Sequence, residues 1–160
     1  PRGAEMTYVR TAAEMSAAMT ARAADADVVI MVAAVADYRP MRVSSRKIKK
    51  TSDALTLSLE RTDDVLSTLA QSKGSKVLVG FAAETDDVHA NALEKLRRKN
   101  LDLIVANDVS AAGSGFDGST NSAIIIDSAC NERHSGRVSK DDLAEMILDE
   151  VARIAPSVLS

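Results

Sequence analysis

The chain has 160 residues, of which 46% are apolar, and this length and composition suit a single domain with one buried core. A net charge of −3 gives no overall attraction to polyanions, and two Tyr, two Phe and no Trp leave little surface for stacking bases, so we expect no nucleic-acid binding. One cysteine and two histidines exclude an internal disulfide and a zinc-like set of ligands. The lack of a signal peptide and of a long apolar run predicts a soluble, intracellular protein without membrane contact.

The first two predicted elements are a helix and a buried strand. Residues 11–25 repeat apolar side chains at helical intervals, and Thr11 and Glu14 have the spacing of a capping box. Val28 to Val35 form an unbroken apolar run that is too short for a typical helix and rich in β-branched residues. Such a run predicts a strand covered on both faces, as in a parallel sheet.

The middle of the chain predicts two more buried strands with a helix between them. Residues 76–82 and 101–106 repeat the short apolar pattern, and residues 85–99 have an amphipathic helical pattern. The order strand, helix, strand predicts parallel strands joined by a right-handed crossover. Upstream of them, the leucines of residues 55–59 alternate with polar residues, which is typical of a half-exposed strand.

The last third predicts a hairpin and a closing helix. Residues 123–126 form a short apolar strand with residues 133–138 as its antiparallel partner, and Ser139 caps a helix over residues 140–154. We therefore predict the α/β class, with a three-layer Rossmann-like or ribokinase-like sheet. The sheet should be mostly parallel, with a small antiparallel flap and a C-terminal β-hairpin.

Candidate site residues follow the predicted strands, because ligands of open α/β sheets bind beyond the carboxyl ends of the strands. After the first strand, the small residues 33–36 leave room for a base or a ribose, and the carboxylate of Asp37 follows at once. The same residues equally suit packing under a helix, with Asp37 capping or turning the chain.

A basic run comes next in a chain that is otherwise acidic. Its members are Arg39, Arg42, Arg46, Lys47, Lys49 and Lys50. Such a cluster would neutralise a polyphosphate or a phosphorylated substrate. If residues 47–49 are extended, both lysines share one face, as in a flap that closes over phosphates. A solvated surface loop is the alternative explanation.

The ends of the other strands give weaker signals. Gly80 permits close backbone contact, and Phe81 lies either against a base or in the core. Lys95 and Lys99 share one helix face, where they would bind phosphate or complement the helix dipole. The glycine-rich residues 113–121 are no P-loop, because they lack the terminal Gly-Lys-Ser/Thr and precede a strand.

Five segments, in this order and spacing, resemble the synthetase domain of bacterial phosphopantothenoylcysteine synthetases. They are Ala33–Pro40, Lys47–Lys50, Gly80–Thr85, Lys99–Asp102 and Ala106–Val109. Later, Gly115-Phe116 and Asn121 fit the same pattern. The resemblance runs over nearly the whole chain and implies one domain over residues 1–160.

The resemblance implies a CTP-dependent ligase of coenzyme A biosynthesis that joins 4′-phosphopantothenate to L-cysteine. The carboxylate attacks the α-phosphate of CTP to give an acyl-cytidylate and pyrophosphate, and the cysteine amine then displaces CMP. Mg²⁺ is expected to shield the triphosphate. The family also implies a cytoplasmic homodimer, and FMN only where a flavin-dependent decarboxylase domain is fused upstream.

Carried over position by position, the resemblance makes Lys47 the catalytic lysine that assists formation of the acyl-cytidylate. The nucleotide-binding residues that it implies are Met31, Val32, Ala33, Asp37, Lys47, Asp63, Asp64, Val65, Leu66, Phe81, Lys95 and Lys99. Residues 62–65 depart from the family's Asn-Pro-Asp-Ile, since the aspartate is kept and the proline is not. We expect a helix to start there with Thr62 as its N-cap.

The family opens with a glycine-rich strand-to-helix turn and an asparagine-bearing segment, and nothing resembling either precedes Pro1. We therefore expect an N-terminally incomplete domain that alone binds CTP weakly or does not turn over. A non-catalytic nucleotide-binding or dimerisation module of the same fold is the alternative function. A nicotinamide-dependent enzyme is a third candidate, but the chain lacks Gly-x-Gly-x-x-Gly. The sequence leaves CTP and ATP both open.

Overall fold

The central feature of the computed structural model is a five-stranded sheet in the order β1-β4-β5-β6-β7. The structure describes residues 3–49, 54–84, 87–108 and 120–156. Strands β1 (Val28–Met31), β4 (Val77–Glu84) and β5 (Leu103–Asp108) are parallel neighbours. Strands β6 (Thr120–Asp127) and β7 (Glu132–Ser139) continue the sheet as an antiparallel hairpin. The predicted α/β sheet with its parallel strands and C-terminal hairpin is confirmed.

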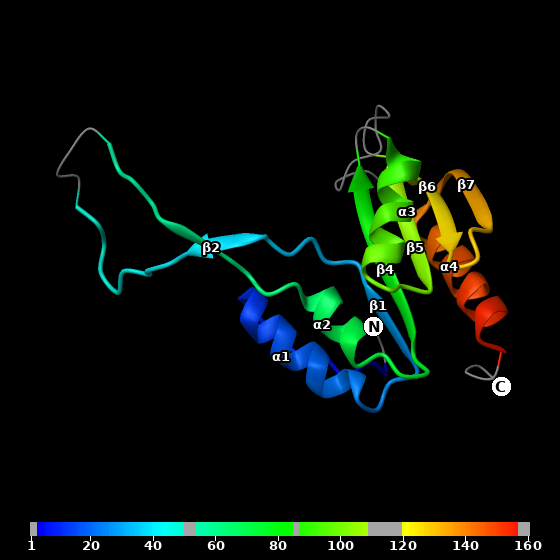
Figure 1. Ribbon diagram of the computed structural model, residues 1–160, viewed down its shortest axis with the longest axis horizontal. Coiled ribbons are helices and arrows are strands. Elements are labelled where there is room, and N and C mark those ends of the chain that lie inside the picture. Colours follow the sequence, from blue (N-terminus) through cyan, green and yellow to red (C-terminus); the bar gives the residue numbers. More distant parts are fainter. Residues whose placement is uncertain (1–2, 50–53, 85–86, 109–119, 157–160) are drawn as a thin grey trace.

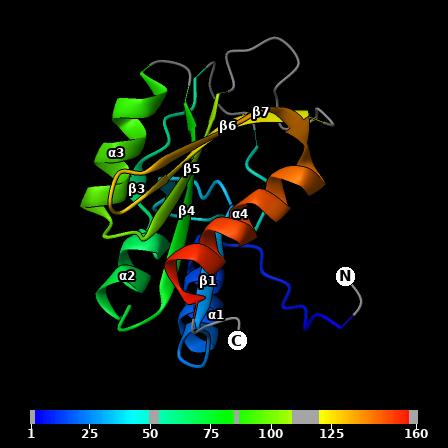
Figure 2. The same cartoon turned by 90° about the vertical axis from the view of Figure 1, so that its right-hand side faces the viewer.

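Helices cover both faces of this sheet, which gives the three predicted layers (Figures 1 and 2). Helices α1 (Ala12–Ala23), α2 (Val65–Gln71) and α3 (Val88–Arg98) lie on one face, and α4 (Lys140–Ile154) lies on the other. Side chains alternate along the strands. Leu78 and Ile104 face the first three helices, while Val79 and Val105 face α4. The sheet is therefore buried on both faces, as its unbroken apolar runs predict.

Gly80 lies where side chains of α2 and of the chain before β5 pack close to the sheet backbone. A Cβ at this position would lie 2.6 Å from Cδ1 of Leu101 and 3.1 Å from Cδ2 of Leu66. The glycine thus makes room for core side chains of its own chain, and the space above it is filled by these leucines.

Helix boundaries follow capping side chains, with one correction to the sequence prediction. Thr11 and Glu14 form the expected capping box of α1, and Ser139 caps α4 as expected. The prediction of Thr62 as N-cap of α2 is wrong: Asp64 is the N-cap, and it accepts a hydrogen bond of 3.0 Å from the amide of Ser67. The hydroxyl of Thr62 instead donates to the carbonyl of Ala36. No helix within the described residues has the length and apolar character needed to cross a membrane.

The described residues between β1 and α2 form an arm that extends away from the sheet (Figure 1). Its base is an antiparallel pair of short strands, β2 (Tyr38–Pro40) and β3 (Leu59–Arg61). The predicted first strand ends at Met31 and does not continue to Val35, because β1 pairs with β4 only as far as Met31. The predicted strand around residues 55–59 is also displaced, and its three leucines are all exposed. Residues 47–49 form no strand.

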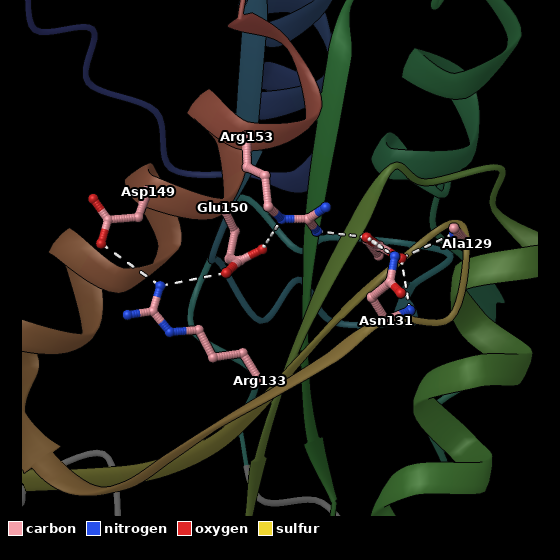
Figure 3. A network of polar contacts seen from close by, with 7 residues as sticks. Ala129, Asn131, Arg133, Asp149, Glu150 and Arg153 are labelled. Carbon is pink, nitrogen blue, oxygen red and sulfur yellow. Dashed lines mark hydrogen bonds and ion pairs between the residues drawn. The ribbon is translucent and has the colours of Figure 1, made fainter.

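A buried carboxylate fastens the turn between β6 and β7 to the end of α4. Asp127 is 3% exposed and accepts hydrogen bonds from the amides of Ala129 and Asn131 at 2.9 and 2.8 Å. The guanidinium of Arg153 in α4 donates to it at 2.5 Å. Figure 3 shows Arg153 reaching from α4 toward this turn, with Glu150 next to it. Burial alone would raise the pKa of Asp127, but the bonds from Asn131 and Arg153 outweigh burial and hold the pKa below its usual value.

Replacing Asp127 with alanine is expected to lower the free energy of unfolding by about 2 kcal/mol at pH 7, because buried donors lose their acceptor. The depressed pKa means that this contribution is present above the unfolded-state value of about 3.9 and is lost as the pH falls through the folded-state value. Urea unfolding between pH 7 and pH 3 measures both effects. Asp149→Ala is the control, since its side chain is 69% exposed and has one ion pair, of 3.6 Å, with Arg133. Equal losses in both variants would contradict the prediction.

Candidate functional site

A cavity of about 700 Å³ lies at the carboxyl ends of β1, β4 and β5. It is bounded by the residues that follow β1, by the segment that leads into α2, and by parts of α3 and α4. This is where open α/β sheets bind their ligands, and the volume suits a small molecule of nucleotide size. The cavity is therefore the candidate site.

The cavity brings together the predicted nucleotide-binding residues, with one exception. Those that line it are Met31, Val32, Ala33, Asp37, Asp63, Asp64, Val65, Leu66, Phe81, Lys95 and Lys99. They come from four separate segments of the chain. Lys47 is the exception: it lies on the arm, is exposed, and does not line the cavity.

Lys99 and Asp64 form an ion pair that joins the end of α3 to the start of α2. The ammonium of Lys99 lies 2.9 Å from Oδ2 of Asp64, and the Lys99 side chain is only 14% exposed. Burial tends to raise the pKa of Asp64, but hydrogen bonds from Lys99 and from Ser67 lower it further than burial raises it. The pair thus places a positive and a negative charge at the wall of the cavity.

Lys95 is held against β4. Its ammonium donates a hydrogen bond of 2.6 Å to the carbonyl of Phe81, which lines the cavity together with Ala82 and Ala83 of the same strand. Lys95 in the last turn of α3 and Lys99, its C-cap residue, are four positions apart, and both line the cavity. Two cations on one wall make this side of the cavity suitable for phosphate groups.

The rest of the basic run lies on the arm or outside the described residues. Arg39 on β2 pairs with Glu60 on β3 at 2.9 Å, so this arginine stabilises the arm. Lys50 and the glycine-rich residues 113–119 lie outside the described residues. Lys47 reaches a ligand in the cavity only if the arm moves toward it or if the arm belongs to a second copy.

The sequence places Asn107, within Ala106–Val109, and Asn121 in the family pattern without giving them a place in the site, and it does not identify Lys140. Asn107 at the end of β5, Asn121 at the start of β6 and Lys140 at the start of α4 also line the cavity. Asn107 directly follows the apolar run of residues 101–106, which is a signal of the kind used for the other strands. Nothing in the sequence indicates that α4 folds back to the same edge.

Replacing Asp64 with alanine is expected to destabilise the protein by about 1 kcal/mol at pH 7, because α2 loses its N-cap. The carboxylate has a depressed pKa, so its contribution is present above about pH 4 and disappears as the pH falls through the folded-state value. Thermal unfolding at pH 7 and pH 3 tests this. The neighbouring Asp63, which is exposed and caps no helix, provides the matched control Asp63→Ala, and a similar loss there would refute the role of the cap.

Relatives of known family match the chain over almost its full length. The family model for the DNA/pantothenate metabolism flavoprotein C-terminal domain matches residues 1–154. The coenzyme A biosynthesis bifunctional protein CoaBC of Bacillus subtilis (strain 168) is 44% identical over 156 residues, which are 97% of this chain and 38% of that protein. CoaBC of Vibrio cholerae serotype O1 is 42% identical over 92% of this chain and 38% of its own length. The chain thus spans about two fifths of the length of these relatives.

Solved structures agree with this family. The crystal structure of the C-terminal domain of a CoaBC protein superposes with a TM-score of 0.80 at 32% identity, covering 98% of this chain and 69% of that one. The DNA/pantothenate metabolism flavoprotein from Streptococcus pneumoniae shares the fold, with a TM-score of 0.74 at 22% identity, over 91% of this chain and 71% of that one. This chain therefore belongs to the family of the DNA/pantothenate metabolism flavoprotein C-terminal domain, as its motifs predict.

Proposed function

We propose that this domain is a ligase of coenzyme A biosynthesis that joins 4′-phosphopantothenate to L-cysteine with CTP, through an acyl-cytidylate. The observation that carries the proposal is the cavity at the strand ends, which gathers Lys95, Lys99, three aspartates and the small residues after β1. These are positions that the family resemblance implies for the nucleotide. The names of the CoaBC relatives support the pathway.

The cavity suits the chemistry of carboxylate activation. A carboxylate is a poor acyl donor, and its attack on the α-phosphate of CTP brings negative charges together. Lys95 and Lys99 supply positive charge on one wall, and Asp64 and the Phe81 carbonyl hold them in place. Cations that are held in place before the reaction stabilise the negative charge that develops in the transition state, because they do not have to move first. Ala33 and Ala34 also line the cavity, and their small side chains leave room for the nucleoside.

Mg²⁺ would enter this site with the nucleotide. Among the described residues no group of three or more His, Cys, Asp and Glu side chains is placed to hold a metal ion. Mg²⁺ commonly binds through substrate phosphates and one or two carboxylates, and Asp37 and Asp63 both line the cavity. We expect the ion to be held by the triphosphate with help from these carboxylates, where it would shield phosphate charge.

The arm supports a homodimer as part of the proposal. Large apolar side chains on it are exposed, namely Tyr38, Met41, Val43, Ile48, Leu55, Leu57 and Leu59. Exposed apolar side chains concentrated on one segment mark an interaction surface. A second copy of the chain that covers them would also bring its own Lys47 close to this protomer.

A double replacement, Val43→Asp with Leu57→Asp, is expected to convert the dimer into a monomer, because the two exposed side chains are 88% and 59% accessible and would meet the partner. Sedimentation velocity measures the mass. Leu148→Asp is the matched control, since this leucine is 51% exposed on α4, away from the arm. A wild-type monomer, or an unchanged dimer in the double variant, would refute the interface.

The proposed reaction is tested by pyrophosphate release. The intact gene product, given CTP, Mg²⁺ and 4′-phosphopantothenate, is expected to release pyrophosphate and, once cysteine is added, to form the amide and CMP. No release with either CTP or ATP rejects the ligase. CTP binding in calorimetry without any release favours a non-catalytic nucleotide-binding or dimerisation module. Release with ATP alone corrects the nucleotide and keeps the reaction.

A further inference from the structure

The cavity extends beyond the nucleotide-binding residues onto the α4 face of the sheet. There it is lined by Val105 from β5 and by Leu143, Ala144 and Ile147 from the first half of α4. Val105, Leu143 and Ile147 belong to the core between the sheet and α4, and Ala144 is exposed beside them. Lys95, Lys99 and Asp64 belong to the helices on the opposite face. The nucleotide assignments therefore leave this part of the cavity without a ligand.

Two asparagines project into this part from neighbouring strands. Asn107 lies two residues after Val105 on β5, and Asn121 lies two residues before Ala123, which pairs with Asn107 across the strands. The period of two along a strand places both side chains on the α4 face. The Oδ1 atoms of Asn107 and Asn121 are buried and accept no hydrogen bond. Buried acceptors without a donor are rare and costly, so this pair indicates a ligand that carries N–H or O–H groups.

The side chains around these two asparagines suit a small amino acid as the ligand. Lys140 at the start of α4 lies in the same wall, and its ammonium suits a carboxylate. Leu143, Ala144 and Ile147 give the space an apolar side that suits a short side chain. The side-chain oxygens of Asn107 and Asn121 accept no hydrogen bond within the protein, so they suit an amine, whose N–H groups can donate to them.

We propose that the α4 side of the cavity binds the amino-acid co-substrate and that Asn107 and Asn121 accept hydrogen bonds from its amine. The proposal rests on the proposed ligase function and adds to it the site of the second substrate. The amine nitrogen, in its neutral form, attacks the acyl carbon of the acyl-cytidylate. The new C–N bond forms as the C–O bond to the phosphate breaks, CMP leaves with the electron pair, and the amine loses a proton to water.

Uncharged acceptors suit this step better than carboxylates do. A carboxylate beside the amine would stabilise the ammonium form, which has no lone pair for attack. Amide oxygens hold the N–H groups and leave the lone pair free to point at the acyl carbon. The two asparagines would therefore orient the nucleophile while leaving it reactive at neutral pH.

The test separates the two half-reactions in the intact gene product. Asn107→Leu and Asn121→Leu are each expected to raise the KM for cysteine about tenfold, the effect of losing one hydrogen bond to a substrate. Pyrophosphate release from CTP and 4′-phosphopantothenate, measured without cysteine, should stay within about twofold of wild type, since these residues act after that step. Asn91→Leu, on the exposed surface of α3, is the matched control and should change neither value.

Aspartate variants give a second, independent readout that keeps the size and polarity of the side chains. Asn107→Asp and Asn121→Asp should move the rising limb of the pH profile for amide formation to higher pH, because the new carboxylate favours the ammonium form. An unchanged cysteine KM in the leucine variants, or an equal loss of pyrophosphate release, would overturn the subsite. A wild-type protein that releases no pyrophosphate would reject the ligase itself, which is a different result.

Discussion

Replacing Lys47 with alanine is expected to slow the formation of acyl-cytidylate by about 100-fold or more, the usual loss when one preorganised charge is removed from a reaction centre. Lys47 lies on the arm and does not line the cavity, so it can act only when an arm, from the same chain or from a second copy, lies over the cavity. The dissociation constant for CTP should therefore change much less, by about threefold or less. Single-turnover pyrophosphate release and calorimetry measure the two quantities.

Lys49→Ala is the matched control for this prediction, because Lys49 is also exposed and lies two residues farther along the arm. It should keep most of the activity. Equal losses in the two variants would mean that the basic run acts as diffuse positive charge. Normal pyrophosphate release by Lys47→Ala would remove the catalytic role assigned to it.

Replacing Lys99 with methionine is expected to weaken CTP binding by about 100-fold, since truncating one partner of a hydrogen-bonded charge pair in a binding site costs about 2–5 kcal/mol. The methionine keeps the length of the side chain. It removes the ammonium and also leaves the carboxylate of Asp64 facing the phosphates. Calorimetric titration with CTP measures the loss.

Two further variants sharpen this result. Arg98→Met removes a neighbouring cation whose side chain is 65% exposed, and it should change CTP affinity by about twofold at most. Asp64→Asn combined with Lys99→Met should recover part of the affinity, because the uncompensated carboxylate is gone. If Arg98→Met costs as much as Lys99→Met, general charge and not the position of Lys99 determines binding.

Sequence patterns correctly predicted those elements whose boundaries are set by interactions between residues close together in the chain. The capping box of Thr11 and the cap of Ser139 placed the starts of α1 and α4, since these bonds lie within a few residues. The apolar runs of β4 and β5 identified doubly covered strands. The prediction that the first strand continues over residues 32–35 was wrong, because an apolar run does not reveal how far a partner strand pairs with it. The prediction of Thr62 as an N-cap was wrong, because its hydroxyl donates a hydrogen bond to the carbonyl of Ala36, which is distant in the sequence.

The candidate site was predictable where its residues follow strands in sequence. Asp37 and Phe81 were found in this way, and the family motifs added Lys95 and Lys99. Lys140 could not be found, since its place in the cavity depends on how α4 returns across the sheet. The unpaired oxygens of Asn107 and Asn121 likewise emerge only from the three-dimensional arrangement of neighbouring strands.

Asp64 serves two neighbours at once, and this limits which residues can replace it. Serine, threonine and asparagine start a helix about as well as aspartate does, so α2 alone would accept any of them. None of them carries the negative charge that steadies Lys99. A substitution of Asp64 that leaves the thermal unfolding temperature unchanged would therefore still remove the ion pair that holds the ammonium of Lys99 at the cavity wall. A screen for stability alone would overlook this loss.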